Sequence, residues 1–155
     1  RPDFNTGSDV LILDDGSHEI ADLIWFQNDL KVIHFIHCKA SHGDAPGRRK
    51  ADADILFTQA MRSIHWVYSV SLIDRLNERI QGNSELILTN QATWNALSDD
   101  YRLNEWKFNI ILHQPGFDIA QVSKRDRNNN NVYELAIPMY ERILSSLATL
   151  EIWGS

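Results

Sequence analysis

The fold of this chain is decided by EIADLIWF (residues 19–26) and VIHFIHCK (residues 32–39), two apolar runs short enough to be neighbouring strands. Each run carries polar residues that a buried strand rarely tolerates: Asp22 in the first, and His37 and Lys39 near the end of the second. Burying a carboxylate or an ammonium group costs several kcal/mol unless the group binds a partner, a metal or a ligand. These positions are therefore the first candidates for a functional site.

The residues around these runs predict a meander of three antiparallel strands. Val10–Leu13 is a short apolar run, and Asp15-Gly16 is a two-residue turn signal that leads into residues 19–26. A second turn, Gln27-Asn28-Asp29, precedes residues 32–39. Because antiparallel neighbours place facing residues on one side of the sheet, this arrangement brings Asp22 within side-chain reach of His37 and Lys39.

Further along the chain the apolar spacing changes to three and four residues. One long helix is predicted over 52–81, with a bend near 69–71, followed by strands at 85–89 and 108–112 and by a short helix or covering loop at 93–103. A helix at 137–148, with Pro138 in its first turn, and a strand at 150–153 complete the order. The sequence therefore predicts an α/β domain whose central mixed sheet opens with the meander and is flanked by helices.

Composition predicts a single globular domain over residues 1–155. The chain is 43% hydrophobic and 23% charged, and no apolar run approaches the roughly 20 residues of a membrane-spanning helix. Residues 1–8 have the composition of a linker, so we expect the domain to be a fragment of a longer protein. The single cysteine, Cys38, allows no intrachain disulfide, and we expect a reducing, cytoplasmic setting without a membrane.

The acid on one strand and the His37-x-Lys39 pair on the next resemble the core of the PD-(D/E)XK, or restriction-endonuclease-like, nuclease superfamily. The resemblance covers roughly residues 10–90 and implies a divalent metal ion, Mg²⁺ or Mn²⁺, as cofactor. It implies that Asp22 binds the metal, that Lys39 orients the attacking water and the phosphate, and that His37 is a second ligand or a hydrogen-bond donor. It also implies assisting roles for Glu19, as a metal ligand, and for Gln59 on the following helix.

One position departs from the family pattern, because His37 stands where the family has its second acid. A neutral imidazole suits transition metals better than hard, oxygen-seeking cations. Glu19, or Asp14 and Asp15 in the turn, can supply the missing carboxylate. Two alternatives stay open: Asp14-Asp15-Gly16 as ordinary turn chemistry, and Asp22 with Lys39 as a structural ion pair.

Nucleic-acid contacts are predicted in two basic loops. The net charge of −6 disfavours broad affinity for nucleic acid. Residues 40–50 and 123–131 are nevertheless locally basic, and they lack apolar periodicity. We expect their basic side chains to contact DNA, with solvated loops as the alternative: Arg48, Arg49, Lys50, Lys124, Arg125 and Arg127.

Two functional hypotheses follow from the resemblance. The first is a metal-dependent DNA nuclease, the effector module of a larger bacterial phage-defence or DNA-processing protein, with a helicase or other domains of the same chain, or a second copy of it, as partners. The second is a catalytically inactive nuclease-fold module that binds nucleic acid or a protein partner. His37 at the position of the second acid is the feature that favours the second hypothesis.

Overall fold

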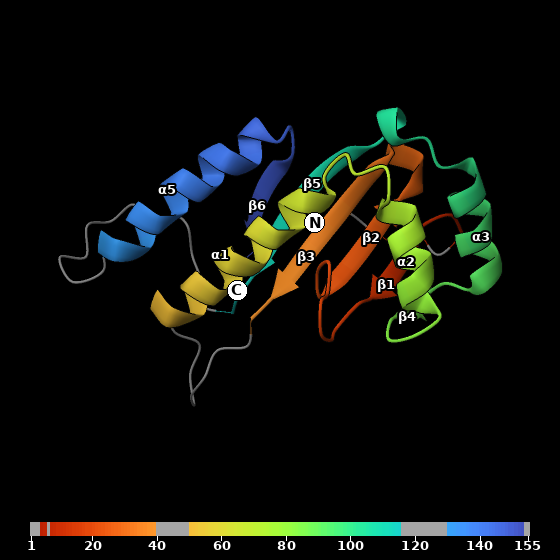
Figure 1. Ribbon diagram of the computed structural model, residues 1–155, viewed down its shortest axis with the longest axis horizontal. Helices are drawn as coiled ribbons and strands as arrows, with labels where there is room; N and C mark the ends of the chain where they lie inside the picture. The colour runs from red at the N-terminus through yellow and green to blue at the C-terminus, as the bar shows by residue number, and fades with distance from the viewer. Residues whose placement is uncertain (1–3, 6, 40–49, 116–129, 154–155) are drawn as a thin grey trace.

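The computed structural model describes residues 4, 5, 7–39, 50–115 and 130–153 (Figure 1). For residues 50–53 and 130–136, which begin two helices, it describes the backbone alone. The six predicted DNA-contacting side chains, at positions 48–50, 124, 125 and 127, lie outside the described part of the chain.

In the part of the chain that the structure describes, six strands form one mixed sheet in the order β4-β1-β2-β3-β5-β6. Their bounds are β1 Val10–Leu13, β2 Leu23–Gln27, β3 Val32–Cys38, β4 Glu85–Ile87, β5 Lys107–His113 and β6 Thr149–Trp153. Strands β4, β1, β2 and β3 pair antiparallel, whereas β3, β5 and β6 pair parallel. The predicted α/β class and mixed sheet are confirmed, and the first three strands pair consecutively and antiparallel.

Within the described residues, four α-helices flank this sheet. They are α1 Lys50–Ser63, α2 Leu72–Ile80, α3 Gln91–Asp100 and α5 Asn130–Ser145. Three short 3₁₀ turns lie between elements: η1 Asn28–Leu30 between β2 and β3, η2 Ile64–Trp66 between α1 and α2, and η3 Leu103–Glu105 between α3 and β5. Helix α1 contacts β3 and β5, and α5 packs beside α1 and against β6 (Figure 1). The face of β3 that α1 covers is the face on which His37 lies.

The main core is a row of apolar side chains that crosses four strands. Ile12 faces Ile24 across β1 and β2, Ile24 faces Phe35 across β2 and β3, and Phe35 faces Ile110 across β3 and β5. All four are fully buried and belong to the same core cluster as the α1 residues Leu56, Phe57 and Ala60. Burial stabilises by about 1.5–3 kcal/mol for each large side chain, and a one-residue slip would turn the row toward the wrong face. This row therefore fixes the register that sets Asp22 opposite His37.

The predicted two-residue turn at Asp15-Gly16 is wrong. Strand β2 begins at Leu23, and residues 14–22 form a longer loop whose ends are joined by the Asp14 N–H donating to the Asp22 carbonyl at 3.0 Å. Ile20 and Ala21 look like strand residues in the sequence, but they are buried because the loop folds into the helix-covered core. The apolar character of Ile20 and Ala21 therefore reflects burial in the core rather than pairing in a strand.

The single long helix predicted over 52–81 is also wrong, because α1 and α2 are separate. Between them Tyr68 has a left-handed backbone, with φ of 56°, and its ring packs against Phe108 at 4.9 Å. Residues 67–71 are valine, tyrosine and serine, which are weak helix formers. Because the local helix propensity is low, the contact between Tyr68 and Phe108 can interrupt the helix at little cost.

The remaining elements lie near their predicted places, with shifted bounds. Residues 93–103, predicted as a helix or a loop, contain most of α3, and β4, β5 and β6 include most of the predicted strand residues. Helix α5 begins at Asn130 rather than at 137, so Pro138 lies inside it and not in its first turn. Proline inside a helix removes one backbone hydrogen bond, a loss that the buried neighbours Met139 and Ile143 help to offset.

Candidate metal centre

The loop at 14–22 is held in place by a buried ion pair. Asp14 is fully buried, its carboxylate accepts hydrogen bonds from the Arg79 guanidinium and the Ser84 hydroxyl, and its second oxygen accepts from the Ile20 N–H at 2.8 Å. Arg79 also donates to the Ser17 and His18 carbonyls, both at 3.2 Å. Both oxygens of the Asp14 carboxylate are thus used in structural hydrogen bonds. Asp14 is therefore not the additional metal ligand that the sequence allowed.

Three other acids of this region converge. One carboxylate oxygen each from Asp15, Glu19 and Asp22 lies within 4.8 Å of the other two. Asp15 is exposed, whereas Glu19 and Asp22 are half-buried. Carboxylates this close repel one another unless a cation or a proton is present, so the arrangement has the donor chemistry of a divalent-cation site.

Glu19 is oriented by two donors that come from different parts of the chain. Its Oε1 accepts from the Gln59 side chain on α1 at 3.2 Å, and its Oε2 accepts from the Gly16 N–H at 3.3 Å. The structure therefore brings the two predicted assisting residues together. Gln59 contacts the acidic group through Glu19.

Asp22 lies directly before β2, and its Oδ2 accepts a 2.7 Å hydrogen bond from the Cys38 backbone N–H of β3. Burial raises the pKa of the Asp22 carboxyl above its ordinary value, the Cys38 hydrogen bond opposes the rise, and the charges of Glu19 and Asp15 add to it. A bound cation would lower this pKa again, because it favours the ionised carboxylate.

His37 is 1% exposed, in the space between β3 and the end of α1. Its Nε2 lies 2.6 Å from the Ser63 hydroxyl, which in turn donates to the Ile20 carbonyl at 2.6 Å. The other nitrogen, Nδ1, has no hydrogen-bond partner in the described part of the chain and lies 3.9 Å from Asp22 Oδ2. Burial lowers the pKa of His37 to about 4, so the ring is neutral at pH 7.

Lys39 directly follows β3 and is half-buried, with its backbone N–H donating to the His113 carbonyl at 3.0 Å. Among the described residues, no carboxylate forms an ion pair with its ammonium group. The alternative of a structural ion pair between Asp22 and Lys39 is therefore not borne out in the described part of the chain. The buried acid–base pair of this region is instead Asp14 with Arg79.

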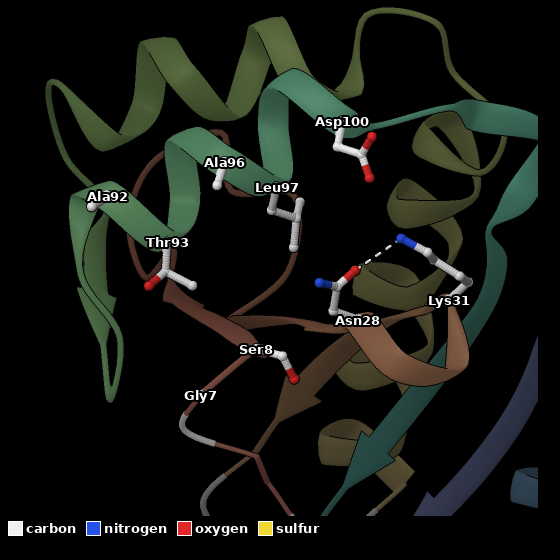
Figure 2. A pocket seen from close by; sticks show the side chains of 9 residues that line it. All are labelled: Gly7, Ser8, Asn28, Lys31, Ala92, Thr93, Ala96, Leu97 and Asp100. Carbon is white, nitrogen blue, oxygen red and sulfur yellow. Dashed lines mark hydrogen bonds between the residues drawn. The ribbon is translucent and has the colours of Figure 1, made fainter.

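Two hollows lined by described residues lie elsewhere. The larger, about 510 Å³, lies between α3 and the turn after β2, where Lys31 donates to the Asn28 side chain at 2.9 Å (Figure 2). The Lys31 ammonium also lies over the Trp106 ring, 5.0 Å from its centre. The smaller hollow, about 360 Å³, lies between α1 and α5 beside Phe57 and Met139. Neither includes a residue of the acidic group.

The sequence alone did not reveal Ser63 or Arg79 as parts of this region. Both lie on helices, at positions where nothing in the local pattern marks them, and both reach residues 14–22 only through tertiary packing. Asp15 was among the acids that the sequence offered, and it does join the cluster.

Comparison of the chain with family models, with curated proteins and with solved structures found no match. Among the described helices, none is long and apolar enough to cross a membrane.

Proposed function

We propose that the chain is a divalent-metal-dependent nuclease domain with a restriction-endonuclease-like core, which hydrolyses phosphodiester bonds of DNA. The observation that carries the proposal is the convergence of Asp15, Glu19 and Asp22, with the unpartnered Nδ1 of His37 at 3.9 Å from Asp22 Oδ2. A buried nitrogen lone pair that faces a carboxylate is unfavourable without a cation or a donor between them. The donor set therefore fits Mg²⁺ or Mn²⁺.

Each residue has a defined task in this proposal. Asp22 and Glu19 bind the ion through carboxylate oxygens, and Gln59 holds Glu19 in place. A divalent ion held there would supply positive charge to the phosphate and would lower the pKa of a water molecule. Lys39, at the end of β3, orients that water and the phosphate. DNA contacts from the two basic segments, cytoplasmic location and a role in bacterial defence or DNA processing remain predictions.

A second candidate function is a nuclease-fold module that binds nucleic acid or a protein without cutting. The feature that favours it is His37 at the position of the family's second acid, because an all-oxygen site suits Mg²⁺ better than a site with one imidazole. The two functions differ in one measurable property, which is cleavage that depends on a divalent metal.

Plasmid cleavage with Mn²⁺, with Mg²⁺ and with a chelator tests the proposal. We expect metal-dependent cleavage by the wild-type chain and a loss on the order of 100-fold or more in Asp22→Ala and in Lys39→Ala, because the first removes a metal ligand and the second removes a positive charge placed at the reacting phosphate. Asp99→Ala and Lys107→Ala, at exposed positions on α3 and β5, are matched controls and should cut normally.

Circular dichroism must show that all four variants remain folded. Cleavage at the wild-type level in both Asp22→Ala and Lys39→Ala would refute the site assignment. DNA binding by the wild-type chain without cleavage at millimolar Mn²⁺ would favour the second candidate function.

A further inference from the structure

The hydrogen bonds around His37 determine which of its nitrogens carries the proton. A serine hydroxyl has one proton, and Ser63 gives it to the Ile20 carbonyl at 2.6 Å, because a carbonyl oxygen can only accept. The Ser63 oxygen must then accept in its 2.6 Å contact with His37 Nε2. The imidazole nitrogen is therefore the donor, and the proton of the neutral ring lies on Nε2.

With the proton on Nε2, Nδ1 presents a lone pair. This atom has no hydrogen-bond partner among the described residues, belongs to a side chain that is 1% exposed, and lies 3.9 Å from Asp22 Oδ2. The two atoms are both acceptors, so neither can satisfy the other. Two metal–ligand bonds of about 2.1 Å span up to about 4.2 Å, so one ion can reach both atoms.

We propose that Ser63 is a positioning residue which holds His37 in the Nε2–H tautomer, and that an ion held between Asp22 and His37 is thereby preferentially a nitrogen-accepting divalent transition-metal ion, such as Mn²⁺, rather than Mg²⁺. The inference rests on the proposed function only for the location of the metal. Carboxylates alone bind both ions, whereas Mg²⁺ prefers an all-oxygen shell and transition metals accept imidazole. The imidazole lone pair is thus the element of the site that discriminates.

Ser63 acts here as an outer partner of a metal ligand. Such partners fix the tautomer and the ring orientation of a ligating histidine, and their removal commonly weakens metal binding 10–100-fold. Ser63 is fully buried at the end of α1 and carries the hydrogen bond to Ile20, next to the loop residues Glu19 and Asp22. The same hydroxyl therefore links the histidine to the loop that bears the acids.

The first experiment uses the unaltered chain. Long-range ¹H–¹⁵N spectra of protein labelled with ¹⁵N-histidine at pH 7 report which ring nitrogens are protonated, and the His37 signals are those absent from His37→Asn. We expect a proton on Nε2 alone, and a selective shift of the Nδ1 signal when Zn²⁺ is added as a diamagnetic probe. A proton on Nδ1, or on both nitrogens, would overturn the inference.

The second experiment measures metal preference by calorimetry with MnCl₂ and MgCl₂. We expect wild-type protein to bind Mn²⁺ at least about tenfold more tightly than Mg²⁺, and Ser63→Ala to lose about 10–100-fold in Mn²⁺ affinity with little change for Mg²⁺. His37→Asp should narrow the gap between the two ions, because it makes the ligand set all-oxygen. Ser145→Ala, at an exposed serine of α5, is the control and should match wild type.

Equal affinity of the wild-type chain for Mn²⁺ and Mg²⁺ would overturn the preference, and this outcome needs no variant to fold. An unchanged His37 tautomer and Mn²⁺ affinity in folded Ser63→Ala would overturn the role of Ser63. The proposed function can fail separately. Mn²⁺ preference without DNA cleavage would leave this inference standing and refute the nuclease, whereas cleavage by a chain whose His37 carries its proton on Nδ1 would do the reverse.

Discussion

His34 and His37 belong to the same strand, β3, and face opposite sides of the sheet with very different partners. His34 stacks on Trp25 at 4.6 Å, and both of its nitrogens are engaged, Nε2 with Gln27 and Nδ1 with Asn109, each at 3.2 Å. His37 has one partner, Ser63, and an open Nδ1 toward Asp22 within the described residues. A buried histidine with both nitrogens engaged stabilises a fold, whereas one with an open nitrogen is prepared for a ligand.

The supports of the two faces differ in the same way. On the His34 face Asn109 donates to Glu151 at 2.6 Å and accepts from Thr149 at 2.9 Å, which extends the network across β5 and β6. On the His37 face the acids sit on a loop that depends on the Asp14–Arg79 ion pair. The first network reinforces a strand pairing that already exists. The second network holds in place a loop whose carboxylates would otherwise repel one another and move apart.

The largest expected effect comes from breaking the ion pair. Arg79→Met leaves the Asp14 charge buried and unpaired, which should lower the free energy of unfolding by about 3–5 kcal/mol and weaken Mn²⁺ binding at the loop. Asn109→Ala should cost about 1–3 kcal/mol and leave Mn²⁺ binding unchanged. Urea unfolding and calorimetry measure both quantities. Equal loss of Mn²⁺ affinity in the two variants would mean that the faces are not independent.

Replacing each histidine in turn should give the next largest effect, a change in Mn²⁺ affinity. His37→Asn should lower Mn²⁺ affinity by about 10–100-fold, because it removes the nitrogen lone pair that faces Asp22. His34→Asn should change that affinity by less than about twofold while lowering stability, because the Trp25 stacking is lost. The opposite ranking in a calorimetric titration would show that the metal binds on the other face of the sheet.

The smallest effect is a dependence of stability on pH. The pKa of His37 falls from 6.5 to about 4 on burial, so the unfolded chain binds more protons between these values and acid favours unfolding. In the absence of metal, His37 should therefore cost about 1.4 kcal/mol of stability at pH 5.5 relative to pH 8. Comparing urea unfolding of wild type and His37→Asn at the two pH values isolates this term. No difference between their pH profiles would contradict the burial of His37 as a neutral ring.

Much of the site could be predicted because strand pairing is local. Asp22 and His37 meet because β2 and β3 are consecutive and antiparallel, and the alternation of Ile24, Phe26, Ile33 and Phe35 sets their register. Gln59 reaches Glu19 because α1 packs on this sheet. The loop at 14–22 was mistaken for a tight turn because Ile20 and Ala21 have a strand's composition but are buried as loop residues.

By itself the sequence determined the α/β class, the order of most elements and the pairing of an acid with a histidine, because apolar periodicity and turn residues act over short distances along the chain. Only the tertiary structure decided that Asp14 belongs to Arg79, that Asp15 joins Glu19 and Asp22, and that Ser63 directs the proton of His37. These contacts depend on where helices α1 and α2 pack on the sheet. Hydrogen bonds and charges act over a few ångströms in space, whatever the separation along the chain, so no local pattern encodes them.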